Sequence, residues 1–486
     1  CFLVMREERS GLWFLRRSRD IAERGLALAL DGYQSQVFLD LFEARDDGRG
    51  LYDELCDSLG GRGVPDLSEA LEDLALKDLY AILGRLAGRN LFTGLRTLVE
   101  PGLPAAKRRK EAIALAGKLA PAAQEFYAAV GGLLDAERPD GETDAKAAAG
   151  TAGAPMAAPA RPAEAAAKGA AAAGSTAGKA VPAGKGRSAA AAQPEQEAAC
   201  AEVAPLAERA TAATIRFCRG ILAAAELAIL ADEAETPHAG KTKAAETATS
   251  EAMTAAVAPK GNRIAGLLRK PWGAEKAAAC LALDGLVALA GRACPGEAAR
   301  RIIERAFLER KLREAMRAAG VPGDESYRSV SLAVTFLARA GELALAMDGS
   351  RTQGPAARAC EIEGLLEGDE DFRHKLGVNL FDGVEWFNKE AFEEALDMGT
   401  LVSFFTAGLE PGGGPGAGAR AGEGFTAAER AALVLRVERA DAIADIFRLA
   451  EIASGFRLGE LGRLMREEAA RRGDRPDPDN TAKKER

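Results

Sequence analysis

The first 45 residues alternate between short apolar runs and turns, a pattern typical of antiparallel β-structure. Two of the runs, Cys1–Met5 and Leu12–Leu15, flank a charged turn that contains glycine. A third run, Leu26–Leu30, leads into Asp31-Gly32, which suits a tight hairpin because glycine accepts a positive φ. The returning strand would be Tyr33–Phe42, in which alternate apolar residues share one face, namely Tyr33, Val37, Leu39 and Leu41. The pattern therefore predicts an antiparallel β-module over residues 1–45.

The chain opens inside the first predicted strand, at Cys1 and without an initiator methionine. A meander of a few short strands is only marginally stable on its own. We therefore expect the β-module to be the truncated end of a longer sheet, and to pack against sequence that would lie upstream.

Beyond the β-module the apolar residues recur with the period of a helix. Leucines follow i, i+4 spacing over Leu51–Leu59. Asp66 with Glu69, and later Thr426 with Glu429, have the spacing of a capping box at the start of a helix. The predicted helical segments are 46–137, a short helical island at 201–231, 263–407, and C-terminal helices at 425–472.

Alanine, glycine, proline and lysine dominate two further stretches, 138–200 and 232–262, which contain almost no large apolar side chains. Such segments cannot offset their ordering entropy by burial, so we predict disordered low-complexity insertions. A Gly/Pro linker is expected at 408–424 and a disordered tail at 473–486. The predicted fold is mainly α: a helical domain, preceded by a small truncated antiparallel β-module and interrupted by disordered Ala/Gly/Pro-rich insertions.

Charge and cysteine content narrow the classes of protein. The formal net charge is −8 over 486 residues, which argues against a nucleic-acid partner because phosphate binding needs clustered positive charge. We interpret the basic run Lys107–Lys110 as a solvated helix face. No apolar run reaches the length of about 18 residues that a membrane span needs. The seven cysteines are odd in number and dispersed, which predicts reduced, packed thiols and a cytoplasmic location.

The sequence offers few groups for catalysis. We interpret His238 as a solvated linker residue and His374 as a surface or capping histidine. The glycine-rich run 411–418 lacks the Lys-Ser/Thr of a phosphate-binding loop. The acidic groups Glu361/Glu363 and Asp369–Asp371 are interpreted as solvated helix faces. We therefore predict no catalytic residue, no metal site and no cofactor.

The segment 376–390 concentrates glycines and aromatic residues. Asn388 is well placed as a helix N-cap, with Phe387 and Phe392 forming a hydrophobic staple and Trp386 buried. We favour this structural interpretation. The functional alternative makes Trp386, Phe387 and Asn388 a carbohydrate or interdomain contact, because aromatic faces stack on the C–H surfaces of sugars.

This segment, LGVNLFDGVEWFNKEAFEEAL, resembles a stretch near the C-terminus of long bacterial α-amylase-like glycoside hydrolases. The N-terminal segments YQSQVFLDLFEARDD and LGGRGVPDLSEAL are similar to the end of the β-sandwich and the start of the helical extension in the same family. The resemblance implies a catalytic (β/α) barrel with an Asp nucleophile, a Glu acid/base and a second Asp, all upstream of the matched regions. Since the barrel motifs are absent here, no catalytic residue carries over onto a position of this sequence.

The expected function is that of an accessory region of such a hydrolase, acting on α-glucans. It would support or position the barrel and would have no hydrolase activity by itself. The expected partners are the upstream catalytic barrel and α-glucan, with no nucleic acid and no membrane. The alternative is a stand-alone cytosolic scaffold whose helical faces bind another protein. An exposed apolar patch on the β-module would favour the accessory region.

Overall fold

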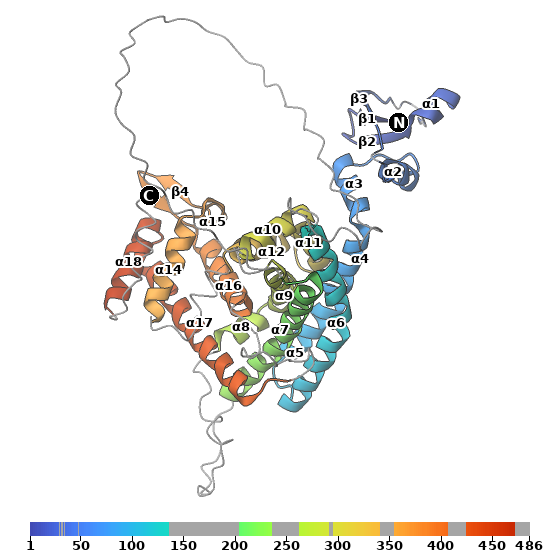
Figure 1. The fold of residues 1–486 in the computed structure, drawn as a ribbon. Coiled ribbons are helices and arrows are strands. Elements are labelled where there is room, and N and C mark those ends of the chain that lie inside the picture. Colours follow the sequence, from blue (N-terminus) through green and yellow to red (C-terminus); the bar gives the residue numbers. More distant parts are fainter. Residues whose placement is uncertain are drawn as a thin grey trace, which may run out of the picture. The chain divides into compact units, whose positions relative to one another are not determined.

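The computed structural model is mainly helical and carries a three-stranded antiparallel sheet near its N-terminus, which confirms the predicted fold class (Figure 1). The structure describes residues 1–28, 30, 33, 35–46, 48–135, 204–235, 262–290, 295–340, 354–406 and 424–471.

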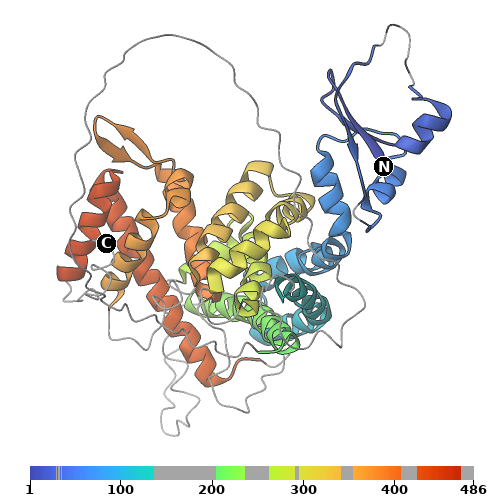
Figure 2. The same ribbon diagram turned by 45° about the horizontal axis from the view of Figure 1, so that its top comes forward.

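The sheet consists of β1 (Phe2–Glu7), β2 (Trp13–Arg17) and β3 (Phe38–Ala44), in the order β2-β1-β3 (Figure 2). Both pairings are antiparallel, and Val4 lies opposite Leu15 on one side and Phe42 on the other. The predicted pairing of the first two strands is therefore confirmed. Because β1 is central, β3 forms one edge of the sheet.

The second predicted hairpin is wrong in its boundaries. Residues 25–28 form no strand, and the returning strand begins at Phe38 instead of Tyr33. Its turn, Asp31-Gly32, lies outside the described residues. An unpredicted helix, α1 (Ser18–Arg24), takes the chain out of the sheet after β2, so β3 pairs with β1. The β1–β3 register also shifts at Asp40, whose φ is +52°, and this bulge interrupts the predicted common face.

The β-module shares a small hydrophobic core with the two helices that follow it, α2 (Leu51–Leu59) and α3 (Leu67–Ala75). Phe2, Val4 and Leu15 of the sheet pack with leucines of both helices. Asp66 caps α3 as predicted, since its side chain accepts a hydrogen bond from the Glu69 backbone N–H at 3.1 Å. This core is separate from the larger core of the remaining helices.

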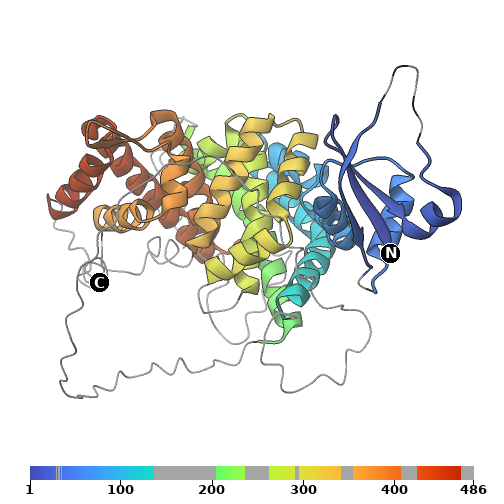
Figure 3. The same cartoon turned by 90° about the horizontal axis from the view of Figure 1, so that it is seen from above.

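Two helices, α7 (Leu206–Glu235) and α9 (Gly273–Leu289), form the centre of the larger core and are buried on nearly every side. Helix α7 is the predicted helical island, and it packs against α6 (Ala105–Asp135) and α9 (Figure 3). Alanine and glycine allow this close contact: a Cβ at Gly220 would lie 2.0 Å from Leu281 Cδ2. Around these helices lie α4 (Lys77–Leu86), α5 (Arg89–Val99) and α8 (Arg263–Arg269).

The chain continues through a further group of helices. They are α10 (Pro295–Arg305), α11 (Leu308–Ala318), α12 (Gly323–Ala338), α14 (Pro355–Glu367), α15 (Glu370–Lys375), α16 (Lys389–Thr406), α17 (Ala427–Ser454) and α18 (Leu458–Arg471). The predicted helical segment 263–407 is thus divided into several helices, with one break between Ala318 of α11 and Gly323 of α12. Thr426 and Glu429 form the predicted capping box at the start of α17. Leu449 of α17 is 64% exposed.

Most of the predicted low-complexity segments lie outside the described residues. The exceptions are Asn262, the N-cap of α8, and 232–235, which is the last turn of α7, so the predicted boundary at 232 is too early. The predicted linker 408–424 and tail 473–486 also lie outside, apart from Gly424.

The basic run at the start of α6 is a solvated face only in part, because Lys107 and Lys110 are exposed but the two arginines between them pair with acidic residues. Arg108 is fully buried, pairs with Asp232 at 2.9 Å and donates to the Glu100 carbonyl at 2.6 Å. Its neighbour Arg109 forms two hydrogen bonds with the buried Glu226. The prediction failed for the two arginines because α7 presents acidic groups to this end of α6, and sequence spacing cannot show that contact.

In the described part of the chain, Cys1, Cys56, Cys218 and Cys280 are free thiols. Cys218 and Cys280 are buried, and burial raises the pKa of both thiols to about 12. This agrees with the predicted packed thiols, although Cys1 is exposed. Within the described ranges, none of the helices combines the length and apolar character that crossing a bilayer demands.

Candidate functional site

The three candidate contact residues lie where a small hairpin leads into α16. The hairpin consists of β4 (Asn379–Phe381) and β5 (Val384–Trp386), and Figure 2 shows it next to the C-terminal helices. Its turn is Asp382-Gly383, with φ values of +51° and +74°. Our sequence interpretation missed this hairpin, although Asp-Gly between two short apolar runs is the signal that could have found it.

Phe387 has the structural role that the sequence predicted. Its side chain is buried, and its ring centroid lies 4.9 Å from that of Phe392 and 6.0 Å from that of Phe456. Its backbone N–H donates to the Phe456 carbonyl at 3.0 Å. The hydrophobic staple is therefore confirmed, and it also ties the start of α16 to the turn between α17 and α18.

Asn388 is the N-cap of α16, as predicted. Its Oδ1 accepts a hydrogen bond from the Ala391 N–H at 2.9 Å, and its own N–H donates to the Leu376 carbonyl at 3.0 Å. The side chain remains exposed and lines a groove, so it caps the helix and is still accessible to other groups.

Trp386 is half-buried, where the structural interpretation expected it buried. It forms an isolated β-bridge with Arg457, and it lies outside the groove that Asn388 lines. A sugar contact at Trp386 stays a prediction.

The groove beside Asn388 has a volume of about 620 Å³, within the range of about 300–1,000 Å³ typical of ligand pockets. Its walls come from α12, α15 and the start of α16. Side chains that line it include Tyr327, Arg328, Asp371, Lys375, Asn388 and Glu394. Of these, the sequence interpretation had considered only Asp371 and Asn388. The others share no motif, because three separate helices bring them together.

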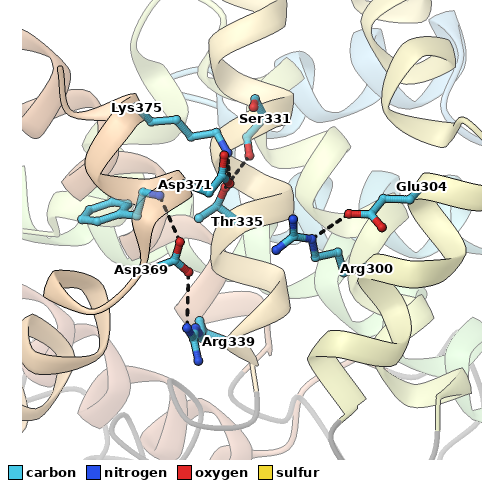
Figure 4. A network of polar contacts seen from close by, with 9 residues as sticks. Arg300, Glu304, Ser331, Thr335, Arg339, Asp369, Asp371 and Lys375 are labelled. Atoms are coloured by element: carbon cyan, nitrogen blue, oxygen red, sulfur yellow. Dashed lines mark hydrogen bonds and ion pairs between the residues drawn. The ribbon is translucent and has the colours of Figure 1, made fainter. Parts of the chain in front are cut away.

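Paired charges hold one wall of the groove in place (Figure 4). Asp371 Oδ2 accepts hydrogen bonds from Thr335 Oγ1, at 3.0 Å, and from Lys375 Nζ. Burial would raise the pKa of Asp371, but the hydrogen bond and charge of Lys375 outweigh burial and lower it. Next to this pair, Asp369 caps α15 by accepting from the Phe372 N–H at 3.0 Å and also accepts from Arg339 at 3.4 Å.

The pKa of Glu394 shifts in the opposite direction from that of Asp371. Burial raises its pKa, and the positive charge of Lys276 offsets this only in part. Arg328 pairs with Glu394 at 3.1 Å and with Glu325 at 3.3 Å. The groove thus holds one carboxyl that ionises readily and one that retains its proton more readily.

Glu363, interpreted as solvated, is instead buried, with 4% of its surface exposed. Packing of α14 against α18 encloses it, which helical spacing alone cannot indicate. The Asp371 side chain is 43% exposed, so it remains partly solvated while it belongs to the network just described.

His374 lies exposed in the last turn of α15, which confirms it as a surface histidine, and it also lines the groove. His238 lies outside the described residues. In the described part of the chain, no group of three or more His, Cys, Asp or Glu residues is placed to hold a metal ion.

A search of family models, of curated proteins and of solved structures found no match to this chain.

Proposed function

We propose that this chain is the non-catalytic C-terminal accessory region of an α-amylase-like glycoside hydrolase, and that its β-module docks onto the catalytic barrel. The resemblance of segment 376–396 and of the N-terminal segments supports the choice of family. The chain would support the barrel and position it on α-glucan. Its location would be the cytoplasm, where free thiols persist.

The observation that carries the proposal is the apolar surface of the sheet edge. We call Val37, Leu39, Leu41 and Phe42 the β3 patch, and their exposed fractions lie between 41% and 57%. Single exposed leucines are ordinary, but four large apolar residues within six positions of an edge strand form a surface that proteins normally cover. A barrel that packs against β3 would cover it.

Binding between this chain and the barrel tests the proposal. The polypeptide encoded in frame upstream of Cys1 is expressed separately and titrated with the chain by calorimetry. We expect Leu39→Ser/Leu41→Ser to weaken binding at least tenfold. The matched control is Leu449→Ser/Ile452→Ser, which removes two aliphatic side chains of α17 that are even more exposed, at 64% and 72%, and should leave binding unchanged.

Equal binding by the wild type and the β3 variant would contradict docking through the β3 patch. Release of reducing sugar from starch by the chain alone, above the rate in buffer, would contradict its non-catalytic role.

A specific observation favours the alternative, a helical scaffold that binds another protein. Leu380 and Phe381 of the β4–β5 hairpin are 71% and 73% exposed, and Ile452 of α17 is 72% exposed. A scaffold would use these residues instead of the β3 patch. Partner binding that is lost in Phe381→Ser and kept in Leu39→Ser/Leu41→Ser would therefore favour the scaffold.

A further inference from the structure

The groove between α12, α15 and the start of α16 has the lining of a site for a ligand with many hydroxyl groups. Its lining contains both donors and acceptors: Arg328 and Asn388 can donate, while Glu390 and Glu394 can accept. Leu332 and Ala391 add apolar surface between them.

Four charged side chains that line the groove are paired with one another. Lys375 pairs with Asp371, and Arg328 pairs with Glu394 at 3.1 Å. Lys276, behind Arg328, pairs with Glu325 at 2.5 Å. A phosphate or carboxylate ligand would have to compete with Asp371 and Glu394 for Lys375 and Arg328, which already hold these carboxylates. The pairing therefore disfavours an anionic ligand and favours a neutral one.

An aromatic ring stands at the side of the groove. Tyr327 of α12 is 53% exposed, and the guanidinium of Arg313 lies 5.1 Å from its ring centroid. This contact leaves half of the side chain exposed, and Tyr327 lines the groove, where a ligand can stack on the ring. An exposed aromatic face beside hydrogen-bonding groups suits the apolar C–H face and hydroxyl edge of a pyranose.

The polar groups of the groove are held in place before any ligand binds. Thr335 and Lys375 both contact Asp371, as Figure 4 shows, and Asn388 is fixed by the cap of α16. Because the cap uses Asn388 Oδ1, the amide NH2 group is left as a donor. Preorganised groups reduce the entropy that binding has to overcome.

We propose that this groove binds a neutral oligosaccharide, with Tyr327 as its stacking platform and the Asn388 amide as a donor to a sugar hydroxyl. The choice of an α-linked glucan among neutral saccharides rests on the proposed function.

Titration of the full chain with maltoheptaose, followed by NMR or calorimetry, tests this inference. Cellohexaose and inorganic phosphate serve as comparison ligands. We expect saturable binding of maltoheptaose, with Tyr327→Ala weakening it at least tenfold and Tyr327→Phe changing it less than threefold, since phenylalanine keeps the ring.

A second variant separates binding from folding. Asn388→Asp keeps the N-cap, because aspartate caps as well as asparagine, but removes the NH2 donor. It should weaken maltoheptaose binding several-fold while the melting temperature stays unchanged. Trp386→Phe, which lies outside the groove, should leave binding unchanged.

Each remaining outcome would overturn part or all of the inference. Absence of maltoheptaose binding at millimolar concentration would refute the saccharide site. Equal affinity for cellohexaose would refute the α-linked preference, and competition by inorganic phosphate would refute a neutral ligand. Barrel docking through the β3 patch does not involve the groove, so loss of sugar binding with docking intact would leave the proposed function standing.

Discussion

Helix α7 and strand β3 are both rich in apolar side chains, yet they end in opposite environments. From Ala213 to Ala231 nearly every residue of α7 is buried, whereas five consecutive residues of β3 are exposed. The difference comes from neighbours and not from composition. Small side chains let α6 and α9 enclose α7, while β3 has β1 on one side only. Apolar content thus predicts burial only where the fold supplies a second surface.

The largest loss of stability is expected where α6 and α9 enclose α7. Arg216 of α7 and Asp284 of α9 pair at 2.6 Å, with exposed fractions of 9% and 1%. Asp284→Ala removes the carboxylate and leaves the buried guanidinium without it, so we expect the free energy of unfolding to fall by about 3–5 kcal/mol. Urea denaturation followed by circular dichroism measures this loss.

The matched control is Glu208→Ala, an exposed acid in the first turn of the same helix. It should cost only about 0.3–1 kcal/mol, from its interaction with the helix dipole. Equal losses in the two variants would show that α7 is not enclosed as described.

A smaller and local effect is expected in the β-module. Leu15 is fully buried in the separate core of the sheet. Leu15→Ala should cost about 2–3 kcal/mol, and hydrogen exchange should show the loss of protection in β1, β2 and β3 with α7 and α9 unaffected. An equal loss of protection in α7 would mean that the two cores unfold as one. The exposed Leu28→Ala serves as the control.

Capping gives a still smaller effect in the helical region. Thr426→Ala removes the side chain that accepts from the Glu429 N–H at 3.3 Å, which should cost about 1 kcal/mol. Thr426→Ser keeps the hydroxyl and should retain most of the stability. Thermal denaturation measures the loss of stability in both variants, and identical losses would rule out the cap as the cause.

The smallest effect is expected at the β3 patch. Leu39→Ser/Leu41→Ser should change the free energy of unfolding of the isolated chain by no more than about 0.5 kcal/mol, because both side chains already face solvent. The same urea denaturation measures it. A loss as large as that of Leu15→Ala would show that β3 packs against this chain and is not a free docking surface.

Local patterns explain which features could be predicted from the sequence. The cap at Asn388 and the staple between Phe387 and Phe392 depend on residues within one turn, so spacing alone identifies them. The pairing of β1 with β2 likewise follows from two apolar runs joined by a short turn.

Features that depend on distant contacts could not be predicted. Arg108 is buried because it meets Asp232, more than a hundred positions later. The groove brings together Tyr327, Asp371 and Glu394 from three helices, and no spacing rule links them. The bulge at Asp40 shifted the face of β3, since one residue with positive φ reverses the alternation.

The reading frame upstream of the Cys1 codon tests the central claim most directly. Sequencing the coding DNA there should reveal a frame that continues into a (β/α) barrel with its Asp, Glu and Asp motifs. A stop codon followed by a credible start at or just before Cys1 would contradict the claim, and the β3 patch would then need another partner.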